Sequence, residues 1–207
     1  MKILSFGDIF LGGTITNENN LDELISEDLK KYINEADFRI ANLESPIMYN
    51  DRPDTKNSPW PKKLLQVAPE RMVELLKKLN INYVSLANNH MFDYGEVGMN
   101  ETIEILKKNN ILFSGSGANI YEALKPAIFK YNDLEIAIYS LCEHNDSFLK
   151  MIVPATKNHY GVSTINYENL EKVKSYSKKY DINILCLHWG RENLIYPAPY
   201  QKKFFNE

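Results

Sequence analysis

The stretch INYVSLANNHMFDYG, residues 81–95, indicates how this chain folds. Its first part, 81–86, is a short apolar run typical of a buried β-strand. Its second part carries two asparagines and a histidine and ends in a turn at 93–95. Apolar residues at helical spacing lie on either side, over 72–79 and 99–106. The stretch is therefore expected to be one strand of a layered α/β fold, with a helix before it and a helix after it.

The same alternation of strand and helix continues along the chain. Short apolar runs predict strands at 2–6, 38–43, 111–113, 134–141 and 182–188, and helical spacing predicts helices at 21–34 and 169–180. Asn132 and Asp133 separate two strand-like runs and predict a β-hairpin. The three prolines within 49–61 predict a long loop. We find no internal repeat and no linker, so residues 1–207 are expected to form a single α/β domain.

The composition is that of a globular protein. The 207 residues include 24 Lys+Arg and 27 Asp+Glu, for a net charge of −3, and 44% of them are hydrophobic. No basic stripe appears in the sequence, so a nucleic-acid partner is not expected. Cys142 and Cys186 each lie in an apolar run, which favours buried core thiols over a disulfide or a zinc site.

Neither a membrane span nor a signal peptide is expected from the sequence. The longest apolar runs are far shorter than the roughly 20 residues that a spanning helix needs. Only four apolar residues precede Gly7-Asp8, which is too few for the hydrophobic region of a signal peptide. These observations leave the compartment open.

Polar side chains follow four of the predicted strands, at the point where each strand ends. They are Asp8, Glu44, the pair Asn89-His90, and His188. In an open α/β sheet, ligands bind in the crevice outside the carboxyl ends of the strands. Two carboxylates, an amide and imidazoles form a ligand set that suits a divalent cation such as Mn, Zn or Fe. The sequence therefore predicts a metal site at this edge, with one ion or a pair.

Each of these motifs also has a simpler interpretation. Gly7-Asp8 is a common turn, and alternation along the strand could place Asn42 and Glu44 on its solvent face. An asparagine after a strand is a common helix N-cap, and a lone histidine at a strand end is often structural. A cap explains one asparagine but neither its neighbour nor the histidine of Asn88-Asn89-His90. The metal-site interpretation is favoured because all four motifs are expected at one edge of the sheet.

Five segments in order resemble a known family. They are GD (7–8), ANLESPI (41–47), VSLANNHMFDYG (84–95), SGSGANIYEALKP (114–126) and LHWGRE (187–192). Together they resemble the CapA/PgsA capsule-synthesis family, which belongs to the calcineurin-like metallophosphoesterase superfamily. The resemblance implies a metallophosphatase-like α/β/β/α sandwich with a metal site between its two sheets.

The resemblance also implies a role for each of these residues. Asp8 would be a ligand of the first metal, and Glu44 would take the place of the bridging carboxylate. Asn89 and His188 would bind the second metal, and His90 beside them would be the catalytic proton donor or transition-state group. We expect the substrate to contact four residues that flank these positions, namely Asn42, Asn88, Asp93 and Glu192.

Two departures from the family pattern bear on catalysis. The first motif of typical metallophosphoesterases is Asp-x-His, whereas the residue two after Asp8 is Phe10. The family pattern continues past His-Trp-Gly to a Gly-His-x-x-His type motif that residues 1–207 do not contain. The domain is therefore expected to be incomplete at its C-terminus.

The resemblance implies a function in the biosynthesis of capsular polysaccharide or poly-γ-glutamate. The expected substrate is an anionic polymer or a phosphoester, and a polymer-synthase complex is the expected partner. Two alternatives stay open. One is a non-catalytic assembly or binding subunit of a synthesis or export complex, and the other is a metal-dependent hydrolase that cleaves an amide or ester of the polymer.

Overall fold

The computed structural model describes residues 1–11, 23, 25–49, 69–144, 152–190 and 195–205. Its strands are β1 (Ile3–Ile9), β2 (Phe38–Leu43), β3 (Tyr83–Ser85), β4 (Leu112–Ser114), β5 (Ser116–Gly117), β6 (Ala127–Tyr131), β7 (Leu134–Cys142), β8 (Gly161–Val162) and β9 (Ile182–His188). Its helices are α1 (Glu27–Asn34), α2 (Pro69–Lys78), α3 (Gly95–Lys108), α4 (Ile120–Ala123), α5 (Tyr167–Ser177) and α6 (Pro199–Phe205).

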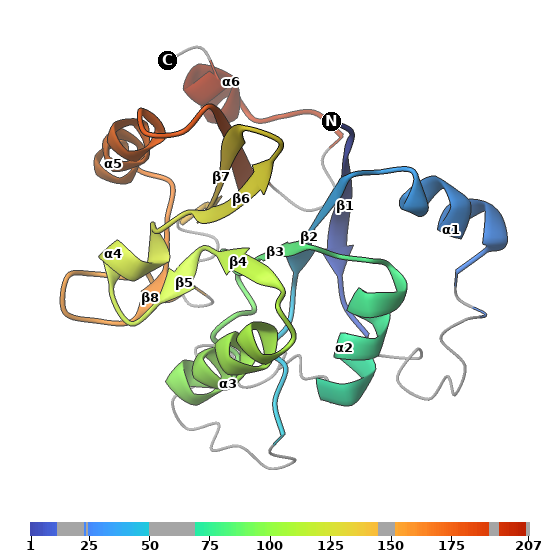
Figure 1. The fold of residues 1–207 in the computed structure, drawn as a ribbon. Coiled ribbons are helices and arrows are strands. Elements are labelled where there is room, and N and C mark those ends of the chain that lie inside the picture. The colour runs from blue at the N-terminus through green and yellow to red at the C-terminus, as the bar shows by residue number, and fades with distance from the viewer. Residues whose placement is uncertain (12–22, 24, 50–68, 145–151, 191–194, 206–207) are drawn as a thin grey trace.

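Two main sheets form the centre of the domain. Strands β1, β2, β3 and β4 pair in that order, and every pair is parallel. The second sheet has the order β6-β7-β9, with β6 and β7 forming the predicted antiparallel hairpin and β9 parallel to β7. Figure 1 shows α2 and α3 on one side of the four-stranded sheet, with β6 and β7 on its other side.

Three hydrophobic clusters separate four layers. On the outer face of the first sheet, Leu43 and Val84 pack with Met72 of α2 and Leu106 of α3. Between the sheets, the rings of Phe38 and Phe129 stack with their centroids 3.7 Å apart. On the outer face of the second sheet, residues of β7 pack with α4 and α5. The α/β/β/α sandwich predicted from the sequence is confirmed by this layering.

The alternation of side chains along each strand decides which residues face the space between the sheets. Phe38 and Ile40 of β2 belong to the cluster between the sheets, so Asn42 continues the same face at the strand's end. Ile184 and Cys186 of β9 do the same for His188, its last residue. The carboxyl end of β2 in the first sheet and that of β9 in the second therefore lie at the same end of the sandwich, where Asn42 contacts His188.

Most element predictions are confirmed, with two corrections. The helix expected at 21–34 begins only at Glu27, because Ser26 has an extended backbone and its hydroxyl accepts from the Leu29 N–H at 3.2 Å. The sequence predicts no strand at 116–117, whereas these residues form β5, which pairs with β8. The loop expected at 49–61 lies outside the described residues from position 50 onward.

Two further sequence predictions concern thiols and membranes. Cys142 is buried and Cys186 half-buried, and both are free thiols, as predicted. Burial raises the pKa of Cys186 to about 11, so this thiol is protonated at neutral pH. Among the helices that the structure describes, none combines the length and the apolar character needed to cross a bilayer.

Two buried tyrosines provide a matched test of the packing. The Tyr83 hydroxyl lies between the sheets and hydrogen-bonds the hydroxyls of Ser114 and Ser140 at 2.6 and 2.5 Å. The equally buried hydroxyl of Tyr139 has no partner among the residues described. We expect Tyr83→Phe to lower the free energy of unfolding by about 1–3 kcal/mol, because it leaves buried hydroxyls with fewer partners.

The second variant is the control for the first. Tyr139→Phe removes a hydroxyl that has no hydrogen-bond partner among the described residues, so we expect it to change the free energy of unfolding by less than about 0.5 kcal/mol or to increase it. Urea unfolding of both variants measures the difference. An equal loss in both would contradict the hydrogen-bonding pattern described above.

Candidate metal centre

Three strands and one turn bring the predicted ligands together. Asp8 lies near the end of β1 and is in register with Asn42 of β2. Glu44 directly follows β2, and His188 ends β9 in the opposite sheet. Asn89 lies in the turn between β3 and α3. Residues from both sheets therefore converge at one end of the sandwich, as the positions of the strand ends predict.

Asp8, Glu44 and His188 form the most compact group. The His188 Nδ1 lies 3.8 Å from Asp8 Oδ1, and the His188 Nε2 lies 3.7 Å from Glu44 Oε1. One ligand atom from each of the three residues lies within 4.8 Å of the other two. Two carboxylates and one imidazole at this spacing fit a divalent cation of the Mn, Zn or Fe type.

Two amides orient the His188 ring. The Asn42 Nδ2 donates to Asp8 Oδ1 at 2.7 Å and lies 3.3 Å from His188 Nδ1. The Asn89 Oδ1 lies 2.9 Å from His188 Nε2. An amide N–H at one ring nitrogen and an amide oxygen at the other fit a neutral imidazole with its proton on Nε2. Burial lowers the pKa of His188 although Asp8 raises it, so the ring is neutral at pH 7 and can act as a ligand.

Asn88 supports this arrangement from the buried side. Its Nδ2 donates to Asn42 Oδ1 at 3.0 Å and to the Leu43 carbonyl at 2.8 Å. Its Oδ1 accepts the backbone N–H of His90 at 3.1 Å. Asn88 is 1% exposed, so these bonds hold it inside the protein. Asn42 and Asn88 thus form a hydrogen-bonded chain behind Asp8, and the hypothesis that they contact substrate stays a prediction.

His90 is held by an aspartate. The His90 Nδ1 lies 2.9 Å from the Asp93 Oδ2, and Asp93 is completely buried. A carboxylate at Nδ1 fixes the orientation of the ring and leaves Nε2 for another partner. His90 lines the cavity described next, whereas Asp93 does not. The structure therefore places Asp93 in contact with His90, and its predicted contact with substrate is untested.

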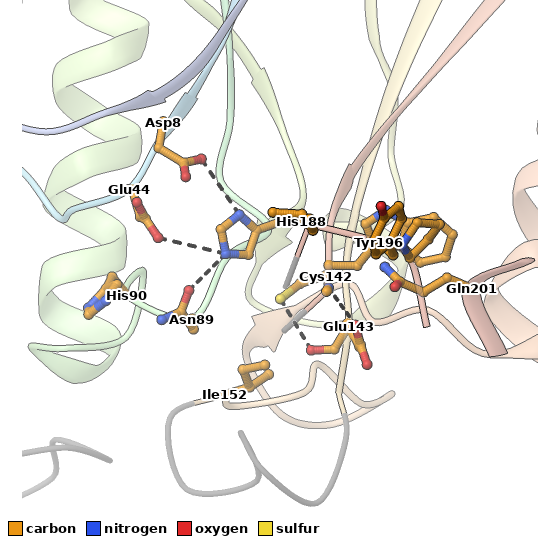
Figure 2. Close-up of a pocket in the computed structure, with 14 residues that line it drawn as sticks. Asp8, Glu44, Asn89, His90, Cys142, Glu143, Ile152, His188, Tyr196 and Gln201 are labelled. Carbon is orange, nitrogen blue, oxygen red and sulfur yellow. Dashed lines mark hydrogen bonds and ion pairs between the residues drawn. The ribbon is translucent and has the colours of Figure 1, made fainter. Parts of the chain in front are cut away.

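A cavity of about 530 Å³ opens over these residues. Asp8, Glu44, Asn89 and His90 lie on one side of His188, whereas Glu143, Tyr196 and Gln201 lie on the other (Figure 2). The described lining includes three carboxylates, those of Asp8, Glu44 and Glu143, and no lysine or arginine. Carboxylates beside an imidazole are donor types that a divalent cation accepts, and these line the described part of the cavity.

Glu143 is a site residue that the sequence analysis missed. Its carboxylate accepts the Tyr200 hydroxyl at 2.5 Å and the Gly190 N–H at 2.8 Å, and its backbone N–H donates to the His188 carbonyl at 2.9 Å. Glu143 thereby ties α6 and the segment after β9 to the end of β7. Its position directly after the apolar strand 134–142 was the available signal, because the other candidates were found at such positions.

Two further positions singled out in the sequence are Glu192 and Phe10. Glu192 lies outside the described residues. Phe10, which stands where the related motif has a histidine, packs against the hydrophobic cluster on the helix side of the first sheet. It therefore contributes no ligand.

The chain was compared with known proteins. The family model of the bacterial capsule synthesis protein PGA_cap matches residues 2–207. The capsule biosynthesis protein CapA of Bacillus anthracis is 27% identical over 204 residues, covering 95% of this chain and 48% of that protein. The PGA biosynthesis protein CapA of Bacillus subtilis (strain 168) is 28% identical over 192 residues, covering 90% of this chain and 48% of that protein. The chain thus spans about half the length of both relatives.

A solved structure also matches over most of the chain. A putative 5'-nucleotidase from Staphylococcus aureus, in complex with alpha-ketoglutarate, aligns with a TM-score of 0.49 at 16% identity and covers 92% of this chain and 38% of that one. The family match extends over all the segments that carry the candidate ligands. The chain therefore belongs to the bacterial capsule synthesis protein PGA_cap family.

Proposed function

We propose that this domain is a divalent-metal-dependent phosphoester hydrolase that acts in the biosynthesis of a capsular polymer, either a polysaccharide or poly-γ-glutamate. The observation that carries the proposal is the group of Asp8, Glu44 and His188 on the wall of a cavity whose described lining has no lysine or arginine. Family membership supports the capsular context.

The donor set would hold the cation between the two sheets. Asp8, Glu44 and His188 are the proposed ligands, with the Asn89 amide oxygen beside them. A divalent cation in such a site supplies Lewis-acid stabilisation of a phosphoryl group and lowers the pKa of bound water. His188 would hold the cation through an unprotonated ring nitrogen, because only the neutral imidazole can act as a ligand.

His90 is the proposed proton donor to the leaving group. Its ring faces the cavity while Asp93 holds Nδ1, so Nε2 is the nitrogen available to a substrate oxygen. Asn42 and Asn88 act through their hydrogen bonds, because they keep Asp8 and the backbone of His90 in position.

Hydrolysis of a chromogenic phosphodiester tests the proposal. The purified protein is assayed with bis(p-nitrophenyl) phosphate in Mn²⁺, in Zn²⁺ and in EDTA, beside Asp8→Asn. We expect hydrolysis that requires the metal and falls about 100-fold or more in Asp8→Asn, because a neutral amide replaces the charged ligand.

The matched control is Asp133→Asn, which makes the same change at an exposed position in the hairpin turn between β6 and β7. It is expected to leave hydrolysis unchanged. Hydrolysis that persists in EDTA, or that survives in Asp8→Asn, would contradict the proposal. A folded, metal-loaded protein that cleaves no phosphoester would favour the non-catalytic subunit instead.

A further inference from the structure

A second hollow of the surface differs in charge from the metal cavity. It lies between α4 and the end of α5, has a volume of about 220 Å³, and is lined by Tyr121, Lys125, Pro126, Tyr176, Lys179 and Tyr180. An adjoining hollow of about 460 Å³ shares Lys125 and Pro126 and extends to Lys107, at the end of α3, over apolar residues of β4 and β6. We call the two together the lysine groove.

The lysine groove has a single sign of charge. Its described lining holds Lys107, Lys125 and Lys179 and no aspartate or glutamate. All three lysines are exposed, and none forms an ion pair with another described residue. Since the whole chain has a net charge of −3, this basic surface is not a consequence of composition. It results from the folding together of three separate segments.

Two other exposed lysines, Lys130 and Lys174, are already paired with glutamates. Lys130 pairs with Glu135 at 3.1 Å, and Lys174 pairs with Glu171 at 3.4 Å. These cations are already balanced by an adjacent carboxylate. The three groove lysines have no such ion pair among the described residues, so they are available to an external anion.

Stabilisation of helix C-termini by lysines explains the position of only one of the three groove lysines. Lys107 lies in the last turn of α3, where a cation interacts favourably with the helix dipole. Lys125 follows the four-residue helix α4, and Lys179 lies two residues beyond the end of α5. Neither of them is inside a long helix, so the dipole does not explain why both line one groove.

The tyrosines give the groove a second type of contact. The rings of Tyr176 and Tyr180 pack on the hydrophobic cluster outside β7, and Tyr121 is 51% exposed on α4. Tyrosine hydroxyls donate hydrogen bonds to carboxylates, and the rings offer apolar contact to the backbone of a polymer. Lysines among tyrosines, with no carboxylate in the described lining, suit a flexible chain that carries repeated carboxylates.

We propose that the lysine groove binds an anionic polymer through the polymer's carboxylates, at a place separate from the metal cavity. The lysine groove and the metal cavity have no lining residue in common among those described. The inference rests on the proposed function only insofar as that function names a capsular polymer. Duplex nucleic acid is a poorer fit, since three lysines on an acidic protein are far from a basic face.

Binding of fluorescein-labelled poly-L-glutamate, measured by anisotropy at low salt, tests the inference. We expect saturable binding that weakens as salt is added. The double variant Lys125→Gln/Lys179→Gln should bind about tenfold more weakly, because each exposed ion pair contributes up to about 1 kcal/mol.

The control is Lys130→Gln/Lys174→Gln, which removes the same charge from lysines that already have partners. It is expected to change the affinity less than twofold. Absence of binding by the wild type, an equal loss in the control, or tighter binding of labelled single-stranded DNA would overturn the inference.

The Asp8→Asn protein separates this inference from the proposed function. It should bind poly-L-glutamate as the wild type does, because Asp8 does not line the groove. If the wild type binds the polymer but hydrolyses no phosphoester, the groove inference is supported and the proposed function is wrong. Hydrolysis without polymer binding would do the reverse.

Discussion

His188→Ala is expected to weaken the binding of Mn²⁺ about 100-fold or more. The imidazole is the only proposed ligand of the compact group that comes from the second sheet, since Asp8 and Glu44 belong to the first. Its removal leaves two carboxylates without the nitrogen donor that completes the set. Loss of a partner outside the direct ligand shell typically costs 10–100-fold in metal affinity, so loss of a ligand should reach or exceed the upper figure.

Isothermal titration calorimetry with MnCl₂ measures this effect. The matched control is His159→Ala, which removes an exposed histidine whose Nδ1 contacts only the Tyr160 carbonyl among the hydrogen bonds of the described chain. Its affinity for Mn²⁺ should equal that of the wild type. If His188→Ala stays folded, as judged by circular dichroism, and still binds Mn²⁺ with wild-type affinity, the assignment of His188 as a ligand is wrong.

His90→Ala is expected to lower kcat for phosphodiester hydrolysis by about 10²- to 10⁴-fold, the usual range for loss of a general acid. Mn²⁺ affinity should change only a few-fold, because His90 lies outside the compact group of ligands. Loss of kcat with little change in Mn²⁺ affinity would identify His90 as the proton donor, whereas loss of Mn²⁺ affinity would identify His188 as a ligand. The leaving group then provides a second test, since a substrate with a good leaving group needs little protonation and should be less sensitive to the variant.

Asp93→Asn tests how His90 is held. An amide oxygen can still accept from Nδ1 but carries no charge, so kcat should fall by less than in His90→Ala while the affinity for Mn²⁺ stays unchanged. A loss of Mn²⁺ binding in His90→Ala as large as that in His188→Ala would contradict the separation of roles. It would make His90 a ligand.

The clustering of Asp8, Glu44 and His188 could be predicted from the sequence because strand ends are marked by strong local signals. The runs 38–43 and 182–188 match β2 and β9 at both ends, so the residues at their carboxyl ends were placed correctly. The parallel pairing of β1, β2 and β3 then brings those ends to one edge. Hydrophobic periodicity and chain direction are sufficient for this part of the site.

The contacts of Glu143 and Asp93 could not be predicted in this way. The bond from Tyr200 to Glu143 joins residues 57 positions apart, and no local pattern indicates it. Asp93 was expected in a turn, where exposure is normal, yet it is buried against His90. Its partner depends on how the turn after β3 folds back, which is a property of tertiary packing.

The lysine groove illustrates the same limit for charge. A search for basic runs finds nothing, because Lys107, Lys125 and Lys179 are distant in the sequence.

The backbone at Gly115 is a second feature that the sequence does not reveal. It has a φ of +105°, and a Cβ at this position would lie 2.6 Å from the Ala87 nitrogen. A glycine in a Gly-Ser-Gly stretch does not reveal such a close approach before the position of the segment after β3 is known.

The most direct test of the metal centre is anomalous diffraction from crystals of the protein soaked in MnCl₂, with data collected at the manganese edge. The account predicts an anomalous peak between the two sheets, within about 2.5 Å of Asp8, Glu44 and His188 side-chain atoms. A well-ordered cavity with no peak there, or a peak bound by other residues such as Glu143, would contradict it.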